Sequence, residues 1–358
     1  MAKNFRNFVA IAITVFLTLG AVSPANASSV PKLFFIAIQG DGLGLYSVSL
    51  SADKHSTVGQ PVAITADTAA AHTSRELATD GQYLYFVDNS HGLGLWDLVR
   101  TDLLGNNRTL LVPDVGSVSK IVVTGVSIYY SVWDKGVYRA SAVGQTVPTL
   151  VFGYDNPAGY PMPPSSGWGP FIIKGGKLYV DNYSTGIFEM DLSFAGASNV
   201  NYISDNNYPG WMVTSLDFDA VTNNYYAWGW NSGTLWGTTD LSLPTNGNWT
   251  QINPSGLQCM CSPGFFRTFY QDGVVYSTDS YGHIWATDLA HGNQAYSLLG
   301  IDENGAKKFT DEDYGIAIAN ADGLANTGSD YSGLYASGIA LLISGLVLLV
   351  LRKRVSAN

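Results

Sequence analysis

The chain has 358 residues, of which 46% are hydrophobic and 13% are charged, and its 18 basic and 28 acidic residues give a formal net charge of −10. This composition is typical of an ordered globular protein and excludes a disordered chain. The negative charge argues against nucleic acid and anionic lipid as partners. The 39 glycines and the many aromatic and β-branched residues favour short strands joined by tight turns over helices.

Residues 1–27 have the three parts of a secretory signal peptide. Lys3 and Arg6 precede an apolar run, residues 8–22, and Ala25-Asn26-Ala27 supplies the small residues of a cleavage site. We expect cleavage between Ala27 and Ser28, so that the exported mature chain begins at Ser28. A retained N-terminal anchor is the alternative.

A short motif with a turn residue, an aliphatic residue and an aromatic residue recurs along the mature chain. The six copies are GLYSVSL from Gly44, GLWDLVRTDL from Gly94, GVYRASA from Gly136, GIFEMDL from Gly186, TLWGTTDL from Thr234 and GHIWATDL from Gly282. They start roughly 42 to 50 residues apart, a period typical of propeller blades. An aromatic-rich strand and a polar turn precede each copy, a further short strand lies before most of these, and another follows the motif. The sequence therefore predicts four antiparallel strands per unit.

The two ends of the repeat array complement each other. The first unit begins at its second strand, KLFFIAI from Lys32, and the segment DYGIAIANADG, residues 313–323, has the form of an innermost strand. A last strand that completes the first blade would close the ring and hide its edges. We therefore predict an all-β fold over residues 28–323, a six-bladed β-propeller with four antiparallel strands per blade, closed by a C-terminal strand.

The repeats resemble those of TolB-like six-bladed β-propellers, including the propellers related to the YWTD and NHL repeat groups. The segment ATDGQYLYFVDN, residues 78–89, carries this likeness. The resemblance spans nearly all of the mature chain and implies a fold and a functional face, but no particular reaction.

The predicted topology gathers the long loops on one face of the disc. The loops that join one blade to the next lie on the same side as the hairpins between the second and third strands of each blade. Aromatic side chains on proline-stiffened loops form rigid contact surfaces for a sugar, a peptide or a protein. Packing of these rings on each other, as a cap on the central channel, is the alternative. The predicted face comprises Tyr154, Tyr160, Trp168, Tyr208, Trp211, Phe265 and Phe266, with Asp88, His91, Asp134 and Asp279 as its polar residues.

Signatures of catalysis are missing from the sequence, which contains no nucleophile elbow, phosphate-binding loop or zinc-protease motif. We therefore predict a protein without a cofactor that binds a ligand, and keep an enzyme as the alternative. Gluconolactonase-type six-bladed propellers, which this chain resembles in fold, hold a metal through acidic or amide side chains in the central channel. The residues expected at that level here are Glu76, Lys120, Pro170, Ser215, Arg267 and Tyr314. Their mixed charges count against a cation.

Acidic clusters, histidines and cysteines are the remaining residues that could bind a metal or take part in redox chemistry. Calcium at Asp217 and Asp219, or at Asp311-Glu312-Asp313, is a weaker expectation than simple solvated turns. The five histidines are expected to be surface residues. Cys259 and Cys261 form either a local disulfide or two free thiols, and we assign them no redox role.

The C-terminal segment, residues 324–358, resembles the cell-wall sorting signal of Gram-positive surface proteins. Leu324-Ala325-Asn326-Thr327-Gly328 is an LAxTG variant of the LPxTG motif, and it precedes an apolar span, residues 334–351, and a basic tail, residues 352–354. The resemblance implies that a sortase cysteine attacks the carbonyl of Thr327 and passes the chain to a peptidoglycan precursor. Ala325 in place of proline leaves the class of sortase open. A permanent single-pass membrane anchor, long enough to span the bilayer, is the alternative.

These features together predict an exported, wall-anchored propeller on the cell surface that binds a protein, peptide or glycan. A secreted propeller hydrolase or lactonase and a structural surface protein are the competing predictions.

Overall fold

The structure, a computed structural model, describes residues 30–39, 42–64, 73–88, 96–132, 135–153, 168–182, 186–193, 200–205, 213–219, 222–229, 234–241, 249–252, 254–255, 265–279, 283–299 and 316–319. The predicted signal peptide, both cysteines, the predicted sorting motif, the apolar span and the basic tail lie outside these residues. Across the described ranges, no helix has the length and apolar character needed to cross a membrane.

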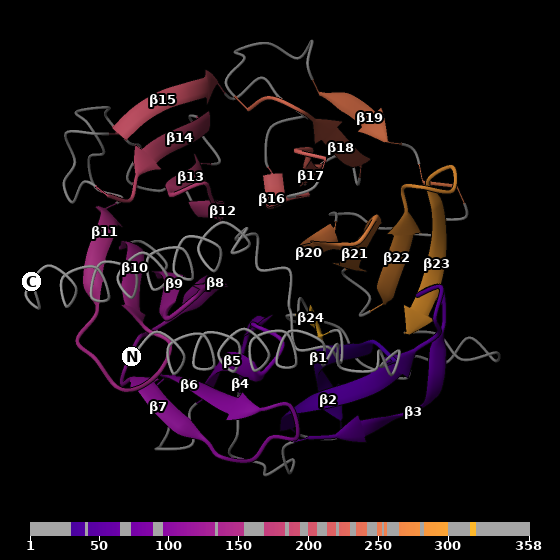
Figure 1. Cartoon of the computed structure of the whole chain (residues 1–358), viewed down its shortest axis with the longest axis horizontal. Helices are drawn as coiled ribbons and strands as arrows, with labels where there is room; N and C mark the ends of the chain where they lie inside the picture. The colour runs from indigo at the N-terminus through magenta and orange to yellow at the C-terminus, as the bar shows by residue number, and fades with distance from the viewer. Residues whose placement is uncertain are drawn as a thin grey trace, which may run out of the picture.

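Six four-stranded antiparallel sheets are arranged radially around a central axis (Figure 1). The prediction of a six-bladed β-propeller is therefore confirmed. From the axis outward, blade 1 contains β24 (Ile316–Ala319), β1 (Lys32–Gln39), β2 (Gly42–Leu50) and β3 (Thr57–Ala63); blade 2 contains β4 (Thr73–Thr79), β5 (Tyr83–Asp88), β6 (Asp97–Asp102) and β7 (Thr109–Val112); blade 3 contains β8 (Val118–Thr124), β9 (Ser127–Val132), β10 (Gly136–Ser141) and β11 (Thr149–Gly153); blade 4 contains β12 (Trp168–Lys174), β13 (Lys177–Asn182), β14 (Gly186–Asp191) and β15 (Val200–Asp205); blade 5 contains β16 (Val213–Phe218), β17 (Tyr225–Gly229), β18 (Thr234–Thr238) and β19 (Thr250–Ile252); blade 6 contains β20 (Phe265–Gln271), β21 (Val274–Asp279), β22 (Ile284–Asp288) and β23 (Gln294–Leu299).

The ring closes through the two ends of the repeat array, as the sequence predicts. Strand β24 pairs antiparallel with β1, and Leu33 lies opposite Ile318 while Phe35 lies opposite Ile316. All four side chains are buried in the cluster between blades 6 and 1. The first blade is thus assembled from both ends of the repeat array, and its innermost strand follows all the other described strands in the chain.

The hydrophobic core consists of six clusters, and each contains residues of two neighbouring blades. The third strand of every blade supplies both of its interfaces, because side chains alternate across a strand. Its first aliphatic residue packs against the following blade; these residues are Leu45, Leu98, Val137, Ile187, Leu235 and Ile284. The next residue packs against the preceding blade; these are Tyr46, Val99, Tyr138, Phe188, Trp236 and Trp285. The repeated motif is therefore the element that joins the blades.

Blade 2 differs from the predicted alignment of the motif. The sequence aligned Trp96 with the other aromatic residues, but the strand register pairs Leu98 with Val87, as it pairs Ile284 with Thr278 in blade 6. The true copy is therefore DLVRTD, in which Val99 takes the aromatic position. Trp96 precedes β6 and packs on the edge of the cluster between blades 2 and 3.

The motif glycine of blade 3 has a backbone requirement. Gly136 has a φ of 151°, and a Cβ atom built there would lie 2.1 Å from the carbonyl oxygen of Phe152 on β11. Only glycine tolerates this conformation and approach. Gly136 thereby lets β10 leave its hairpin and pair at once with β9 and β11.

Candidate functional site

The predicted binding face is only partly covered by the described residues. Tyr154, Tyr160, Tyr208, Trp211, His91 and Asp134 lie outside them. Trp168 is the first residue of β12, and Phe265 and Phe266 are the first two residues of β20. Asp88 and Asp279 are the last residues of β5 and β21. Phe265 lies directly opposite Asp279 in the strand register. The strand ends therefore place Phe265 and Asp279 at the same edge of blade 6.

Asp279 is a buried hydrogen-bond acceptor rather than an exposed carboxylate. His283 Nδ1 lies 2.6 Å from Asp279 Oδ2, and the indole Nε1–H of Trp285 donates to the same oxygen at 3.0 Å. Burial opposes ionisation of Asp279, but the hydrogen bonds from His283 and Trp285 hold its pKa below the usual value. The sequence expected His283 at the surface, yet it is buried, because it closes the hairpin beneath its own aspartate.

Asp88 is also engaged by a neighbouring side chain. The guanidinium of Arg108 donates from Nε to Asp88 Oδ2 at 3.0 Å and from Nη2 to Oδ1 at 2.8 Å. Asp88 is buried, and this paired geometry satisfies both carboxylate oxygens. Asp88 and Asp279 therefore stabilise two hairpins on the predicted face, because their carboxylates accept hydrogen bonds from side chains of the protein itself.

The innermost strands, which surround the central axis, carry residues of both charges, among them Glu76 on β4 and Lys120 on β8. Lys120, Ser215 and Arg267 lie opposite Ser131, Trp228 and Thr278, at one level of their blades, as predicted. A β-bulge interrupts the pairing near the start of the innermost strand in blades 2 to 6. Bulges of this kind re-aim side chains near functional sites.

Asp217 on β16, one residue of the weaker calcium expectation, is already engaged by hydrogen-bond donors and by a nearby cation. Burial raises the pKa of Asp217, while the charge of Lys120 opposes this rise, as do backbone N–H donors of Tyr270 and Phe218. A metal ion at the Asp217 carboxylate would have to compete with Lys120 and with these two N–H donors for its oxygens. Asp219, its companion in the weaker calcium expectation, accepts a hydrogen bond from Thr222. In the described part of the chain, no group of three metal-ligating side chains is placed to hold a metal ion.

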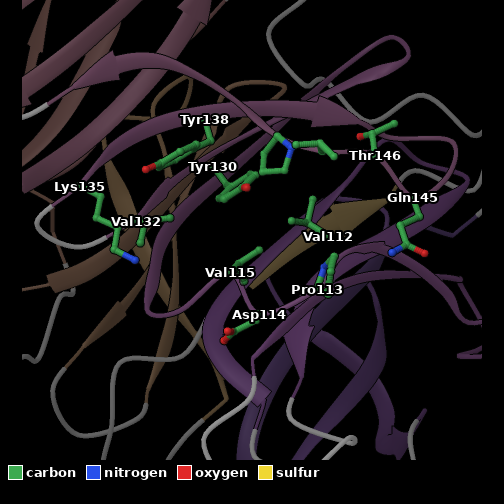
Figure 2. Close-up of a pocket in the computed structure, with 12 residues that line it drawn as sticks. Val112, Pro113, Asp114, Val115, Tyr130, Val132, Lys135, Tyr138, Gln145 and Thr146 are labelled. Atoms are coloured by element: carbon green, nitrogen blue, oxygen red, sulfur yellow. The ribbon is translucent and has the colours of Figure 1, made fainter.

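A groove between blades 2 and 3 is a candidate binding site in the described part of the chain. It has a volume of about 640 Å³, within the range of ligand pockets. Tyr130 and Tyr138 stack with their ring centroids 5.7 Å apart and their planes at 17°. Figure 2 shows these rings beside Val132 and across from Val112 and Val115, with Lys135 at one end and Gln145 and Thr146 at the other. The lining comprises Val112, Pro113, Asp114, Val115, Tyr130, Val132, Lys135, Tyr138, Gln145, Thr146, Val147 and Pro148.

The groove is mainly apolar and has a polar rim. Valine, proline and tyrosine side chains form its walls, while Asp114 and Lys135 are exposed at the rim. Burial raises the pKa of the Tyr130 hydroxyl, so this group stays protonated at neutral pH. The connection that joins blade 2 to blade 3 contributes one side of the groove through residues 113–115. The groove therefore opens beside the predicted binding face.

Two hydrogen bonds hold the segment at residues 142–148 against blade 2 and shape the other end of the groove. The backbone N–H of Thr146 donates to Leu111 O at 3.1 Å, and Arg100 Nη1 donates to Ala142 O at 2.9 Å. The Arg100 guanidinium also lies 4.3 Å from the centre of the Tyr83 ring. These hydrogen bonds and the burial of Ala142 in the cluster between blades 2 and 3 fix the segment as a ridge, and Val143 and Val147 on it remain exposed.

A second hollow, of about 500 Å³, lies on the other side of the same ridge, between blades 3 and 4. It shares Thr146 and Val147 with the groove. Its lining residues are Val126, Ser127, Tyr129, Arg139, Ala140, Ser141, Thr146, Val147, Thr149, Leu150, Val151, Met190 and Leu192. Blade 3 therefore presents an apolar depression on both of its flanks.

Solved structures confirm the architecture. A chain of the crystal structure of a nidogen/laminin complex is 17% identical, with a TM-score of 0.58, and the match covers 81% of this chain and 99% of that one. A putative 6-phosphogluconolactonase from Bacteroides fragilis is 13% identical, with a TM-score of 0.50, over 78% of this chain and 87% of that one. No protein-family model matches the chain, and no curated protein matches it. These likenesses show a propeller fold. They extend to no reaction or ligand at such identity.

The sequence did not predict the groove. Its walls come from the second and third strands of blade 3, from the end of β7 and from two connections that carry no motif, so their meeting depends on how blades 2 and 3 pack. The only signal was Val147-Pro148 after a short polar stretch, which is an ordinary loop pattern. Of the other described histidines, His291 is exposed, as expected, and His55 is only partly exposed, and both contact Asp288.

Proposed function

We propose that this chain is an exported surface propeller, attached to the cell wall through Leu324–Gly328, that binds an extracellular protein, peptide or glycan. The observation that supports binding is the groove between blades 2 and 3, where stacked tyrosines and aliphatic side chains form an apolar floor beside a charged rim. Such a floor gains binding free energy by removing apolar surface from water, and the rim selects the ligand.

The proposed binding surface combines the groove between blades 2 and 3 with the predicted aromatic face. Residues 113–116 and Lys135 belong to the connections that the topology assigns to that face. The groove therefore opens on the side of the ring that the topology assigns to the predicted aromatic face.

Binding is tested with the full-length chain displayed on a Gram-positive host and probed with arrays of glycans and random peptides. Cells that display the chain should retain probes that cells without it do not. Tyr138→Ala should weaken retention at least tenfold, whereas Trp236→Ala, at the same position of blade 5, should not change it. Absence of retention, or equal retention by the two variants, would contradict the proposal.

Attachment is tested separately with Thr327→Ala, which replaces the residue that a sortase would attack. The variant should leave the wall fraction and accumulate in the membrane fraction, because the apolar span is no longer cut off. Thr250→Ala, at an exposed position on β19, is the matched control. If the Thr327 variant stays covalently bound to peptidoglycan, the sorting proposal is wrong.

A further inference from the structure

Blade 3 has the opposite charge to the rest of the chain. Residues 118–153 contain three basic residues, Lys120, Lys135 and Arg139, and one acidic residue, Asp134, in a protein with a net charge of −10. Lys135 and Arg139 are exposed. Each lines one of the two depressions on the blade, Lys135 the groove and Arg139 the second hollow.

Exposed apolar side chains are concentrated on the same blade. Among the described residues, eight large hydrophobic side chains are exposed, and four of these belong to blade 3. They are Val126 at 72%, Val143 at 55%, Val147 at 91% and Leu150 at 51% exposure. Single exposed apolar residues are ordinary, but a group beside two depressions is typical of an interaction surface.

The ridge unites these features into one surface. Val147 stands on the ridge and lines both depressions, while Val126 and Leu150 line the second hollow. Lys135 marks one end of the groove (Figure 2). An occupant that crosses the ridge would bury aliphatic groups on either side of Val147 and meet Lys135 on one flank and Arg139 on the other. Asp114 at the groove rim is the acidic residue of the two linings, which therefore carry two cations and one carboxylate.

We propose that blade 3 docks an acidic, aliphatic peptide segment of a partner protein. Aliphatic side chains of the segment fill the groove and the second hollow, and its carboxylates pair with Lys135 and Arg139. This inference rests on the proposed binding function and names its ligand class.

The chemistry of the lining favours a peptide over a sugar. Most groove residues are valine, proline and tyrosine, which offer few partners for the many hydroxyls of a carbohydrate, and unpaired hydroxyls cost binding free energy. A second copy of this chain fits poorly in a symmetric dimer, because the same basic surface would face itself.

The test uses three labelled hexapeptides in which leucine alternates with glutamate, glutamine or lysine, and the full-length chain displayed on cells, with cells lacking the chain as the blank. The glutamate peptide should bind most tightly and the lysine peptide least. Each exposed ion pair contributes up to about fivefold in affinity, so the preference should fall in high salt. The double variant Lys135→Glu and Arg139→Glu should reverse the order, whereas Lys177→Glu on blade 4 should not.

The outcomes separate the two proposals. If the three peptides bind equally, or only glycans bind, and Tyr138→Ala still removes binding, the acidic-peptide inference is wrong and the binding function stands. Self-association of the chain that the double variant abolishes would likewise contradict it, in favour of a second copy. If no probe of any kind binds, both proposals fail.

Discussion

Two interfaces of the ring, the seam between blades 6 and 1 and the groove between blades 2 and 3, are built in opposite ways. At the seam, the turn at residues 51–56 of blade 1 reaches across to blade 6. His55 Nε2 lies 2.7 Å from Asp288 Oδ2, the His55 ring stacks on Tyr296 with centroids 3.9 Å apart, and Lys54 Nζ lies 2.8 Å from Asp272 Oδ2. At the groove, two hydrogen bonds leave a depression of about 640 Å³.

The difference follows from how each interface is connected. Blades 2 and 3 follow each other in the chain through residues 113–117, so their contact does not depend on side chains alone. Blade 1 is closed by the four residues of β24, and its polar contacts with blade 6 add to that short pairing. The comparison teaches that both interfaces are held by an apolar cluster, but blades 6 and 1 add polar contacts across theirs, whereas blades 2 and 3 leave an open depression beside theirs.

The largest expected effect is at the closing strand. Ile318 is 1% exposed in the cluster between blades 6 and 1, so Ile318→Ala should lower the free energy of unfolding by about 2 to 5 kcal/mol. Denaturant unfolding of the full-length chain measures this loss. Val58→Ala, at an exposed position on β3 of the same blade, should cost little. Equal losses in the two variants would show that β24 does not hold the ring.

A smaller effect is expected at Asp288, which accepts hydrogen bonds from His55, His291 and the backbone N–H of Ala290. Asp288→Ala should lower the free energy of unfolding by about 2 kcal/mol, because hydrogen bonds to a charged group are lost. Asp53→Ala, which removes a largely exposed carboxylate of the same seam, is the control. The same loss in both variants would mean that the polar contacts of the seam contribute nothing specific.

The contribution of Asp288 should also depend on pH. Burial opposes its ionisation, but hydrogen bonds from His291, His55 and two backbone N–H groups lower its pKa below the usual value. A carboxyl with a lower pKa in the folded state stabilises the fold above its unfolded pKa, about 3.9, and loses that effect as the pH falls through the folded pKa. The difference between wild type and Asp288→Ala should therefore be full at pH 6 and shrink below pH 4.

The smallest effect on stability is expected at the groove ridge. Val147 is 91% exposed, so Val147→Ser should change the free energy of unfolding by less than about 0.5 kcal/mol. The same variant should weaken binding of the glutamate peptide, because it removes an apolar contact on both flanks of the ridge. A variant that lost stability and kept its affinity would reverse the comparison between the two interfaces.

Most of the fold was predictable because a propeller repeats its local pattern. The spacing of the motif gave six blades, and the absence of an innermost strand before Lys32 located the closing strand near Ile316. The misaligned copy at Trp96 shows why the alignment of one motif was wrong. Val99 fills the interface at the position where other blades have an aromatic residue. An alignment based on aromatic residues therefore places the motif on Trp96, the nearest aromatic residue in the sequence.

The candidate site was much less predictable. The sequence identified Lys120, Ser215 and Arg267 at one level because strand register follows from alternation. It could not identify the groove, since Tyr138 and Val115 meet only after two blades pack at a particular distance. Nor could it foresee that Asp279 and His283 hydrogen-bond each other within one hairpin, because burial of a polar pair depends on the layers above it.

The pairing of β1 with β24 also makes the fold indifferent to where its chain starts. Because both ends meet inside one sheet, and every blade joins the next through the same two residues of its third strand, linking the ends and opening another connection would preserve all six joints. Such a circular permutant would carry the same groove on a polypeptide with a different order of synthesis.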